Sequence, residues 1–596
     1  MASFWGHVRV TLTWLLPVSL AAVMVVLVVL YAIREVPRVE RQPRFISTSP
    51  MGVYHTWAAI TGAEYCAGTP RRILEMNGTI ADVTVASQLC QSVMNPHQCG
   101  LGGGFISVYY NHATRKAKAF NAREWAPSAA WSNMFLANST LSSYGFLAAA
   151  VPGELMGYRS MLDSIGSRVP WAELFKDAEA LARNGFPVYA DLERLLKQNE
   201  KVITADEALC EVFCSRLYPQ NKTTMVINET LRMPALADTL ATIAREGHQA
   251  FYGGSVGKML SDDIRRKGGL ITLQDLRSYT VKVDDALRRV LHDNVTVLAP
   301  PPPAGGILTA FMLAVMDSYR NPEAPTVKSL PDNDETFHRL VEVTKFAFAG
   351  RMEIGDPEHI DISAVVKNIS SSSFLSEVRS RIKQYPVSDY RYYGLRFQGR
   401  ESHSSCQFVV IMPDGDALAQ MSSLNRDFGA LAISASTGVL LNNEMDDFAN
   451  PGKANTFGLV SSATNYIRPK KRPTSSMSPL VITDADGSVV MATSSTGAFF
   501  ICSGLTQVVM RSLWMNHTVK EAIDAPRIHH QLPAPEVLAE EQIDQDVLQG
   551  LLNRKHQVKF FKWYGEAIAL LRRPGDNRIY GSYDYRFQIT GGMDGD

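Results

Sequence analysis

A hydroxyl and a thiol stand side by side at Ser405 and Cys406, shortly before an apolar run that begins at Phe408. Both side-chain types act as nucleophiles in enzymes, so either could form a covalent intermediate with a carbonyl compound. Several charged and polar side chains stand elsewhere in the chain, at Arg123, Asn425, Glu444, Asp447, Ser475 and Ser476. Taken singly, these residues have ordinary explanations, such as a surface ion pair, a solvated loop or a helix cap. Their joint occurrence is the informative signal.

Other chemistries find little support in the sequence. The seven cysteines show neither a Cys-x-x-Cys pair nor the Cys/His spacing of a zinc site, so we expect no metal. The glycine run 100–104 lacks a Gly-Lys-Ser/Thr ending and precedes a predicted strand, which favours tight backbone packing over nucleotide binding. Because 59 basic residues balance 59 acidic ones, no overall field attracts nucleic acid.

The elements that must position these groups are a mixture of helices and strands. A chain of 596 residues, 46% hydrophobic, can bury a large core. Hydrophobic periodicity predicts helices over 154–165, 171–184, 336–352 and 505–514, and strands over 105–110, 408–412 and 480–483. The proline-rich stretch 300–306 predicts a rigid loop entering a core. The polar stretch 385–405 is a candidate linker or cleavage region.

The N-terminal segment predicts a membrane anchor. No charged side chain occurs from Val10 to Ile33, and about 20 apolar residues span a bilayer as a helix. A cleaved signal peptide is the alternative, although its apolar region is usually shorter, about 7–15 residues. Four arginines soon after the helix would place the following chain in the cytosol under the positive-inside rule.

Seven Asn-x-Ser/Thr sequons argue for the opposite orientation, because glycosylation occurs in the secretory lumen. They lie at Asn77, Asn138, Asn221, Asn228, Asn294, Asn368 and Asn516. We follow the sequons and expect a cytosolic tail (1–9), a signal-anchor helix (10–33), a stalk (34–50) and the remainder outside the cell. The prediction is a single-pass type II plasma-membrane protein with an extracellular catalytic domain.

Several motifs together resemble the γ-glutamyltransferase (glutathione hydrolase) family, of the animal membrane-bound type. The resemblance covers nearly the whole region after the stalk. Its motifs include Asn121-Ala-Arg-Glu124, Val151-Pro-Gly-Glu154, Ser405-Cys-Gln-Phe408, Ser423-Leu-Asn425, Asn442-Asn-Glu-Met-Asp-Asp-Phe448 and Pro473-Thr-Ser-Ser-Met477.

The resemblance implies an α+β fold, the Ntn-hydrolase αββα sandwich, built from a large segment (51–404) and a small segment (405–596) that stay associated. Such a chain cleaves itself before its nucleophile, and the freed α-amine then acts as the base for the same hydroxyl. The motif register assigns the nucleophile to Ser405. The family has Thr there, preceded by Gly-Gly and followed two residues later by His, whereas this chain has Ser405, His403-Ser404 and Gln407. Serine lacks the β-methyl that restricts rotation, and glycine adopts strained backbone more easily.

The resemblance also implies roles for the other groups. Arg123 with Ser475 and Ser476 would bind the substrate α-carboxylate, and Asn425, Glu444 and Asp447 would hold its α-ammonium. Ser423 would orient the nucleophile, while the N–H groups of Gly497 and Ala498 would stabilise the oxyanion. The spacings of Cys66 with Cys90, and of Cys210 with Cys214, are similar to two disulfides of the family.

The function implied is hydrolysis and transfer of γ-glutamyl groups from glutathione and related compounds through a covalent acyl-enzyme, without a cofactor. Water or an amino-acid or dipeptide acceptor would release the acyl group. Two alternatives remain: Cys406 as a rival nucleophile or simply a small buried thiol, and an unprocessed pseudoenzyme that binds γ-glutamyl ligands without turnover. A cell-surface adhesion or receptor domain would not explain why the glutamate-binding residues occur together.

Overall fold

The computed structural model describes residues 47–217, 220, 222–399, 404–452, 454–562, 565–573, 575–586 and 591–596. These residues belong to the unit that spans 45–596. The predicted cytosolic tail, membrane helix and most of the predicted stalk lie outside the described residues. Within the described ranges, no helix combines the length and the hydrophobicity needed to cross a bilayer.

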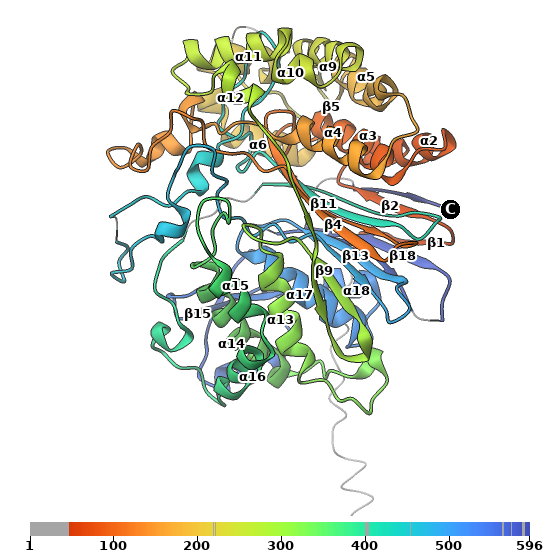
Figure 1. Cartoon of the computed structure of the whole chain (residues 1–596), viewed down its shortest axis with the longest axis vertical. Helices are drawn as coiled ribbons and strands as arrows, with labels where there is room; N and C mark the ends of the chain where they lie inside the picture. The colour runs from red at the N-terminus through yellow and green to blue at the C-terminus, as the bar shows by residue number, and fades with distance from the viewer. Residues whose placement is uncertain are drawn as a thin grey trace, which may run out of the picture. The chain divides into compact units, whose positions relative to one another are not determined.

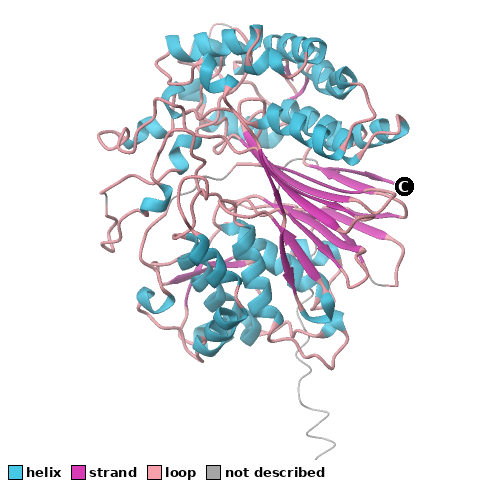
Figure 2. Ribbon diagram, viewed as in Figure 1, coloured by secondary structure: helices cyan, strands magenta, loops and turns pink. Residues whose placement is uncertain are grey.

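Two seven-stranded antiparallel sheets form the centre of this unit (Figures 1 and 2). The first sheet contains, in spatial order, β19 (Gly592–Gly595), β2 (Ala58–Thr61), β10 (Cys406–Ile411), β11 (Ala417–Ser423), β3 (Gly104–Asn111), β4 (Lys116–Asn121) and β7 (Lys282–Asp285). The second contains β1 (Met51–Tyr54), β18 (Ile579–Tyr583), β17 (Ala567–Arg572), β13 (Val489–Ser495), β12 (Leu480–Thr483), β9 (Thr296–Ala299) and β8 (Leu287–Val290). Smaller sheets pair β14 (Ile528–His530), β15 (Glu536–Ala539) and β16 (Gln557–Phe560), and β5 (Phe186–Pro187) with β6 (Thr230–Leu231).

The two large sheets pack face to face through a shared core. Ala119, Val409 and Ala419 of the first sheet join Leu298 and Ala492 of the second in one buried cluster. A hydrogen bond also joins the two sheets: Ser494 Oγ on β13 donates to the carbonyl of Gln420 on β11 at 3.2 Å. The two sheets are therefore held in a defined relative position.

Helices cover the outer face of each sheet, so that the layers run helix, sheet, sheet, helix (Figures 1 and 2). One layer, above the sheets in Figure 1, comprises α2 (Thr69–Glu75), α3 (Ile80–Met94), α4 (Glu154–Ile165), α5 (Lys176–Asn184), α6 (Ala190–Gln198), α7 (Glu200–Ile203), α8 (Glu207–Phe213), α9 (Pro234–Glu246), α10 (Gln249–Tyr252), α11 (Ser255–Arg266) and α12 (Leu273–Arg277). The other comprises α13 (Gly306–Asp317), α14 (Asp334–Arg351), α15 (Ser363–Ser370), α16 (Ser372–Arg381), α17 (Phe500–Leu513), α18 (Val519–Asp524) and α19 (Gln545–Asn553).

The position of β10 between two packed layers explains why residues 408–411 are all apolar. Phe408 and Val410 pack against the first helical layer, whereas Val409 and Ile411 point into the core between the sheets. Successive side chains of a strand alternate between faces, and here both faces are covered. The residue directly before this strand, Ser405, is consequently carried by one of the most buried elements of the fold.

The mixed α+β class predicted from sequence is confirmed by these layers. The predicted helix 154–165 and strand 480–483 match α4 and β12 in both bounds. The predicted helix 505–514 begins earlier, at Phe500, because its first turn follows directly from a tight loop that carries no sequence signal for a helix start. Within the predicted linker 385–405, Gln398 is ordered by a backbone bond to the carbonyl of Val460 at 2.9 Å.

Candidate active site

Ser405 and Ser423 lie at the same end of two neighbouring strands. Strands β10 and β11 are antiparallel, and Cys406 faces Ser422 in their register. Continuing that register by one residue brings Ser405 opposite Ser423. Ser405 is 7% exposed and Ser404 6%, so the peptide bond between them is almost fully removed from solvent.

The hydroxyl of Ser423 contacts the carbonyl of the peptide bond expected to be cut. Its Oγ donates to the carbonyl oxygen of Ser404 at 2.5 Å and accepts the N–H of Asn425 at 2.7 Å. A donor on a carbonyl oxygen polarises the bond and stabilises the negative charge that develops when a nucleophile adds to the carbon. The resemblance implies that Ser423 orients the nucleophile Ser405. In the uncut chain the Ser423 hydroxyl hydrogen-bonds the carbonyl that the nucleophile would attack.

A buried loop between α3 and β3 supports this peptide bond from the other side. The carbonyl of His97 accepts both the Ser404 hydroxyl at 3.2 Å and the N–H of Phe428 at 2.8 Å. Burial lowers the pKa of His97, so its ring is neutral near pH 7. Burial also raises the pKa of Asp427, and the neighbouring Ser404 side chain partly offsets this rise. Sequence reasoning missed both residues, because neither belongs to a motif with an assigned role.

The turn at Gly497 and Ala498 connects β13 of the second sheet to α17. Both residues have positive φ, 113° at Gly497 and 53° at Ala498. A Cβ at 497 would lie 2.7 Å from the Cα of Gly565, so glycine is required there by contact as well as by conformation. Both residues precede α17, and their carbonyls accept the N–H groups of Phe500 and Ile501 at 3.0 and 3.1 Å. Successive backbone N–H groups in such a turn can bind a negatively charged oxygen. This turn can therefore serve as an oxyanion hole.

Glu566 fastens that turn to the strand β17. Its Oε2 accepts the Thr496 hydroxyl at 2.6 Å, its N–H donates to the same hydroxyl at 3.1 Å, and its carbonyl accepts the N–H of Thr496 at 2.8 Å. Burial raises the pKa of Glu566 to about 8, so it is mostly protonated at neutral pH. No motif in the sequence contains this acid.

Arg123 lies at the centre of a buried acidic cluster. Its guanidinium forms ion pairs with Glu444, with Asp447 at 3.4 Å and with Glu124 at 3.6 Å. Arg123 follows β4, whereas Glu444 and Asp447 share a short 3-10 turn (Glu444–Asp447). Burial raises the pKa of Glu124 to about 7. One cation among three acids leaves the cluster suited to a ligand that brings its own ammonium group.

Asn425 ties the acidic turn to the strand that carries Ser423. Its Nδ2 donates to the carbonyl of Asn443 at 3.1 Å, and its backbone has a positive φ of 80°. Asparagine tolerates this left-handed conformation better than most residues. Ser423 and Asn425 are thus connected, through the backbone of Asn443, to the turn whose acids Glu444 and Asp447 pair with Arg123.

The serine pair Ser475 and Ser476 packs against the proline-rich loop 300–306. The N–H of Ser475 donates to the carbonyl of Pro303 at 2.9 Å, and a Cβ at Gly305 would lie 2.6 Å from the carbonyl oxygen of Ser476. Ser476 Oγ accepts Nε of Arg351 at 2.9 Å. The Arg351 guanidinium also stacks over the Phe499 ring, 4.6 Å from its centroid, beside the oxyanion turn.

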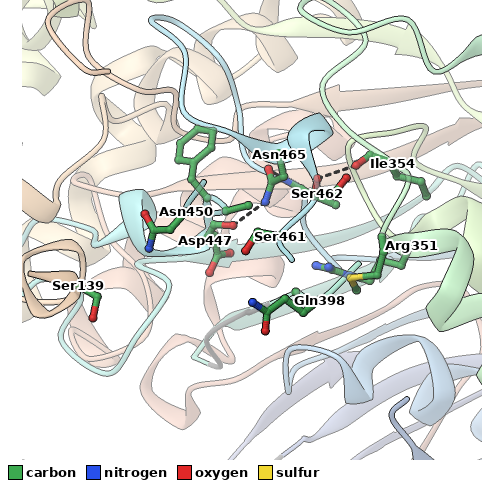
Figure 3. Close-up of a pocket in the computed structure, with 14 residues that line it drawn as sticks. Ser139, Arg351, Ile354, Gln398, Asp447, Asn450, Ser461, Ser462 and Asn465 are labelled. Atoms are coloured by element: carbon green, nitrogen blue, oxygen red, sulfur yellow. Dashed lines mark hydrogen bonds between the residues drawn. The ribbon is translucent and has the colours of Figure 1, made fainter. Parts of the chain in front are cut away.

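A pocket opens beside Asp447 and Arg351 (Figure 3). Figure 3 shows Asn465 donating to the backbone carbonyl of Asp447, at 2.7 Å. Its described lining does not include Ser405. Most of the residues that line the pocket are polar and come from separate segments of the chain, with Ser139, Gln398, Asn450, Ser461 and Ser462 among them. Among the lining residues, the resemblance had implied a role for Asp447, whereas Arg351, at the end of α14, belongs to no motif with an assigned role.

Three disulfides occur among the described residues. Cys66 is bonded to Cys90 and Cys210 to Cys214, the two pairs that the resemblance implies. The third joins Cys99 to Cys406. Cys406 therefore has no thiol in this structure, and both alternatives considered for it, a rival nucleophile and a small buried thiol, are wrong because the sulfur is bonded to a partner 307 residues away.

The described sequon asparagines are all exposed, as glycosylation requires. This holds for Asn77, Asn138, Asn228, Asn294, Asn368 and Asn516. Asn221 lies outside the described residues.

Among the described residues, no group of three or more His, Cys, Asp or Glu side chains is arranged to hold a metal ion.

The chain is similar to known proteins in sequence and in fold. A family model described as Gamma-glutamyltranspeptidase matches residues 66–591. Scoloptoxin SSD14 of Scolopendra dehaani is 34% identical over 540 residues, which cover 91% of this chain and 92% of that protein. The Glutathione hydrolase 5 proenzyme of Mus musculus is 32% identical over 557 residues, 92% of each. The crystal structure of cephalosporin acylase from Bacillus halodurans shares the fold, with a TM-score of 0.79 at 20% identity over 94% of this chain and 98% of that one.

Proposed function

The chain belongs to the gamma-glutamyltranspeptidase family, and from that membership we propose that it is a self-processing enzyme that hydrolyses and transfers γ-glutamyl groups, glutathione being one donor. The single observation that carries the proposal is the Ser423 hydroxyl on the carbonyl of Ser404. It stabilises charge at the one peptide bond whose cleavage would make Ser405 a chain terminus. The word proenzyme in the name of the mouse relative agrees with such processing.

Self-cleavage proceeds in two steps. The Ser405 hydroxyl adds to the carbonyl carbon of Ser404, its proton passes to the departing nitrogen as the C–N bond breaks, and an ester replaces the peptide. Water then hydrolyses the ester, leaving the carboxylate of Ser404 and the free α-amine of Ser405. That amine can accept the proton of the hydroxyl on the same residue, as in other enzymes with a terminal nucleophile.

Turnover uses the same hydroxyl on a γ-glutamyl substrate. The Ser405 Oγ attacks the γ-carbonyl while its proton moves to the α-amine, and the N–H groups of Gly497 and Ala498 stabilise the oxyanion. The protonated amine then gives its proton to the departing amino group, which leaves an acyl-enzyme. Water completes hydrolysis, whereas the amino group of an amino acid or dipeptide completes transfer.

The charged cluster around Arg123 supports a substrate that is itself a zwitterion. In the absence of substrate, Arg123 pairs with Glu444 and Asp447. An incoming α-carboxylate would pair with Arg123 and the hydroxyls of Ser475 and Ser476, while the α-ammonium would pair with the two acids and the side-chain oxygen of Asn425. Each buried charge thereby keeps a partner in both states, which avoids the cost of leaving an ion unpaired.

We propose further that the catalytic domain lies outside the cell as a type II plasma-membrane protein. The six exposed sequons and the three disulfides support an oxidising, glycosylating compartment. The charge-free segment from Val10 to Ile33 supports the anchor, and residues 51–404 and 405–596 would be the large and small segments after cleavage.

The proposal is tested by expressing the wild type and Ser405→Ala in animal cells. On a reducing denaturing gel, the wild type should yield two fragments, the smaller beginning Ser-Cys-Gln-Phe, and the purified protein should release glutamate from glutathione. Ser405→Ala should remain whole and inactive. Ser405→Thr should process faster, because the β-methyl restricts rotation of the hydroxyl. A wild type that stays whole and inactive, with Ser405→Thr no better, would instead identify an unprocessed γ-glutamyl-binding pseudoenzyme.

A further inference from the structure

The Cys99–Cys406 disulfide spans the bond at which the chain is proposed to cut itself. Cys99 lies in the loop after α3, within the large segment, and Cys406 is the first residue of β10, within the small segment. Both residues are 1% exposed. The other two disulfides, Cys66–Cys90 and Cys210–Cys214, each lie wholly within the large segment.

We propose that Cys99 and Cys406 are positioning residues, whose disulfide keeps the two fragments covalently joined and holds the newly formed terminus at Ser405 in the catalytic site. This inference rests on the proposed self-cleavage. It adds a covalent link between the fragments and a second anchor for the nucleophile.

Cleavage creates the mechanical problem that the disulfide solves. Before cleavage, Ser405 is held by the chain on both sides. Afterwards it is the first residue of its fragment, and chain ends lose order unless they are tied down. Cys406 is the next residue, and the disulfide holds its Cα 5.8 Å from that of Cys99. The anchor is thus one residue from the reacting hydroxyl.

The loop that carries Cys99 is itself fastened to the catalytic region. The carbonyl of Gln98 accepts the N–H of Leu424 at 2.9 Å, and the carbonyl of His97 accepts the N–H of Phe428. Leu424 directly follows Ser423. The disulfide therefore ties the nucleophile strand to a loop that is already bonded next to Ser423, so it anchors Ser405 relative to its catalytic partner.

The serine at the nucleophile position makes such an anchor useful. Serine keeps more freedom about χ1 than threonine does, because it has no β-methyl. A fixed backbone one residue away removes motion that would add to this side-chain freedom. Small displacements of a reacting group can lower a rate by up to about 100-fold, so backbone order at this point bears directly on turnover.

The chemistry balances without any group from the active site. Disulfide formation removes two protons and two electrons from the two thiols. The oxidant is the disulfide of an oxidoreductase in the secretory lumen, which is reduced to a dithiol by thiol–disulfide exchange. Cleavage of the Ser404–Ser405 peptide consumes only water. The S–S bond is therefore unchanged by processing.

The first test runs wild-type protein, with free thiols blocked by iodoacetamide, on denaturing gels with and without reductant. We expect two fragments with reductant and a single joined species without it. Two fragments in both lanes would overturn the tether while leaving self-cleavage intact. One uncut chain in the reduced lane would instead overturn the proposed processing, and the tether between fragments with it. This test needs no variant, so a folding defect cannot obscure it.

The second test measures catalysis in Cys99→Ala/Cys406→Ala, with Cys210→Ala/Cys214→Ala as the matched control. The first variant should show separate fragments without reductant and a kcat about tenfold lower, with KM for glutathione nearly unchanged, because Arg123 and Glu444 are untouched. Adding Ser405→Thr should recover part of the lost kcat, which a general loss of stability would not predict. The control should keep the joined species and wild-type kcat. An unchanged kcat in the first variant would overturn the anchoring role.

Discussion

At the scale of single residues, the chemistry depends on two serines on neighbouring strands and on one buried arginine. Ser423 contacts the Ser404 carbonyl, and Arg123 pairs with the acids that would bind the substrate ammonium. In the proposed mechanism the two positions serve different events. Ser423 would act at a peptide bond of the chain itself, whereas Arg123 would act on a bound ligand. Substitutions at the two sites should therefore separate processing from substrate binding.

Ser423→Ala should slow self-cleavage by about 100-fold, the usual effect of losing one donor to a developing oxyanion. The rate can be followed on a reducing gel as newly made protein converts to fragments. Ser423→Thr is the matched control, because it retains the hydroxyl, and it should cleave at close to the wild-type rate. Cleavage of Ser423→Ala at the wild-type rate would show that the bond to Ser404 has no catalytic role.

Arg123→Ala should not affect self-cleavage, so both fragments should still form. It should lower kcat/KM for glutathione by about 100-fold, chiefly by raising KM, because a charge-assisted contact is lost. The variant should also melt at a lower temperature, since Glu444 and Asp447 lose their buried partner. Arg123→Lys restores the charge without the planar fork, so it should recover stability more fully than affinity. An unchanged KM in Arg123→Ala would exclude the arginine from the substrate site.

At the scale of elements, the site is assembled where strands end. Ser405 and Ser423 come from the first sheet, whereas the oxyanion turn follows β13 of the second. The bond between Ser494 on β13 and Gln420 on β11 joins the two sheets directly. The distance between nucleophile and oxyanion hole is therefore determined by the packing of the sheets and by the turn between β13 and α17.

Within that turn, Gly497→Ala should lower turnover strongly, whereas Ala498→Gly should leave it nearly unchanged. The first places a Cβ against Gly565 at a φ of 113°, so turnover should fall at least 100-fold as the turn is displaced. The second relieves a positive φ that costs alanine about 1–2 kcal/mol, offset by about 0.5–1 kcal/mol of added backbone freedom. Its kcat should stay within about twofold of wild type. Steady-state kinetics of both purified variants decide the matter.

Glu566 makes stability depend on pH. Its pKa in the folded protein is about 8, against 4.5 for an ordinary glutamate. Between these values the folded state holds a proton that the unfolded state has lost, so this group's contribution is full below about pH 4.5 and is lost as pH rises through about 8. Glu566→Gln, which stays neutral, should therefore lose less Tm between pH 5 and pH 8 than the wild type does.

Thermal melts at the two pH values measure this difference directly. Burial also raises the pKa of Glu124 and Glu154, each to about 7, so the wild-type slope contains their contributions as well. Comparison with Glu566→Gln isolates the single group, since the other two acids are unchanged. Equal pH slopes for the two proteins would contradict the raised pKa.

At the scale of the whole molecule, the fold supplies a rigid frame on which two fragments can remain together. Strand β10, from the small segment, pairs with β2 and β11 and so lies between strands of both segments. The C-terminal strand β19 pairs with β2 near the start of the described chain. Association of the fragments therefore does not depend on the disulfide alone, which instead secures the position of the new terminus.

Expressed in animal cells, the full chain should reach the cell surface and carry N-linked glycans. Surface biotinylation should label it, and an N-glycosidase should increase its gel mobility. Replacing the six exposed asparagines by glutamine should reproduce most of that increase without enzyme, which serves as the control. A cytosolic product unaffected by the glycosidase would contradict the extracellular proposal.

Local patterns in the sequence were sufficient for the fold class, several elements and the candidate site residues. Hydrophobic periodicity predicts α4 and β12 because it reflects burial of one or both faces of a single element. The resemblance of the motifs to the family selects Ser405, Ser423 and Arg123 as candidates, because each motif is a short continuous stretch. These properties need no knowledge of which distant segments meet.

Only the tertiary structure decided which groups become partners. Cys99 and Cys406 are 307 residues apart, and their spacing contains no information about pairing. Arg351 reaches Ser476, and Glu566 reaches Thr496, because separate segments meet where the sheets end. The pKa of Glu566 likewise depends on burial by residues distant in the chain. Contacts between distant segments follow from the packing of complete layers, and so they cannot be obtained from patterns within one element.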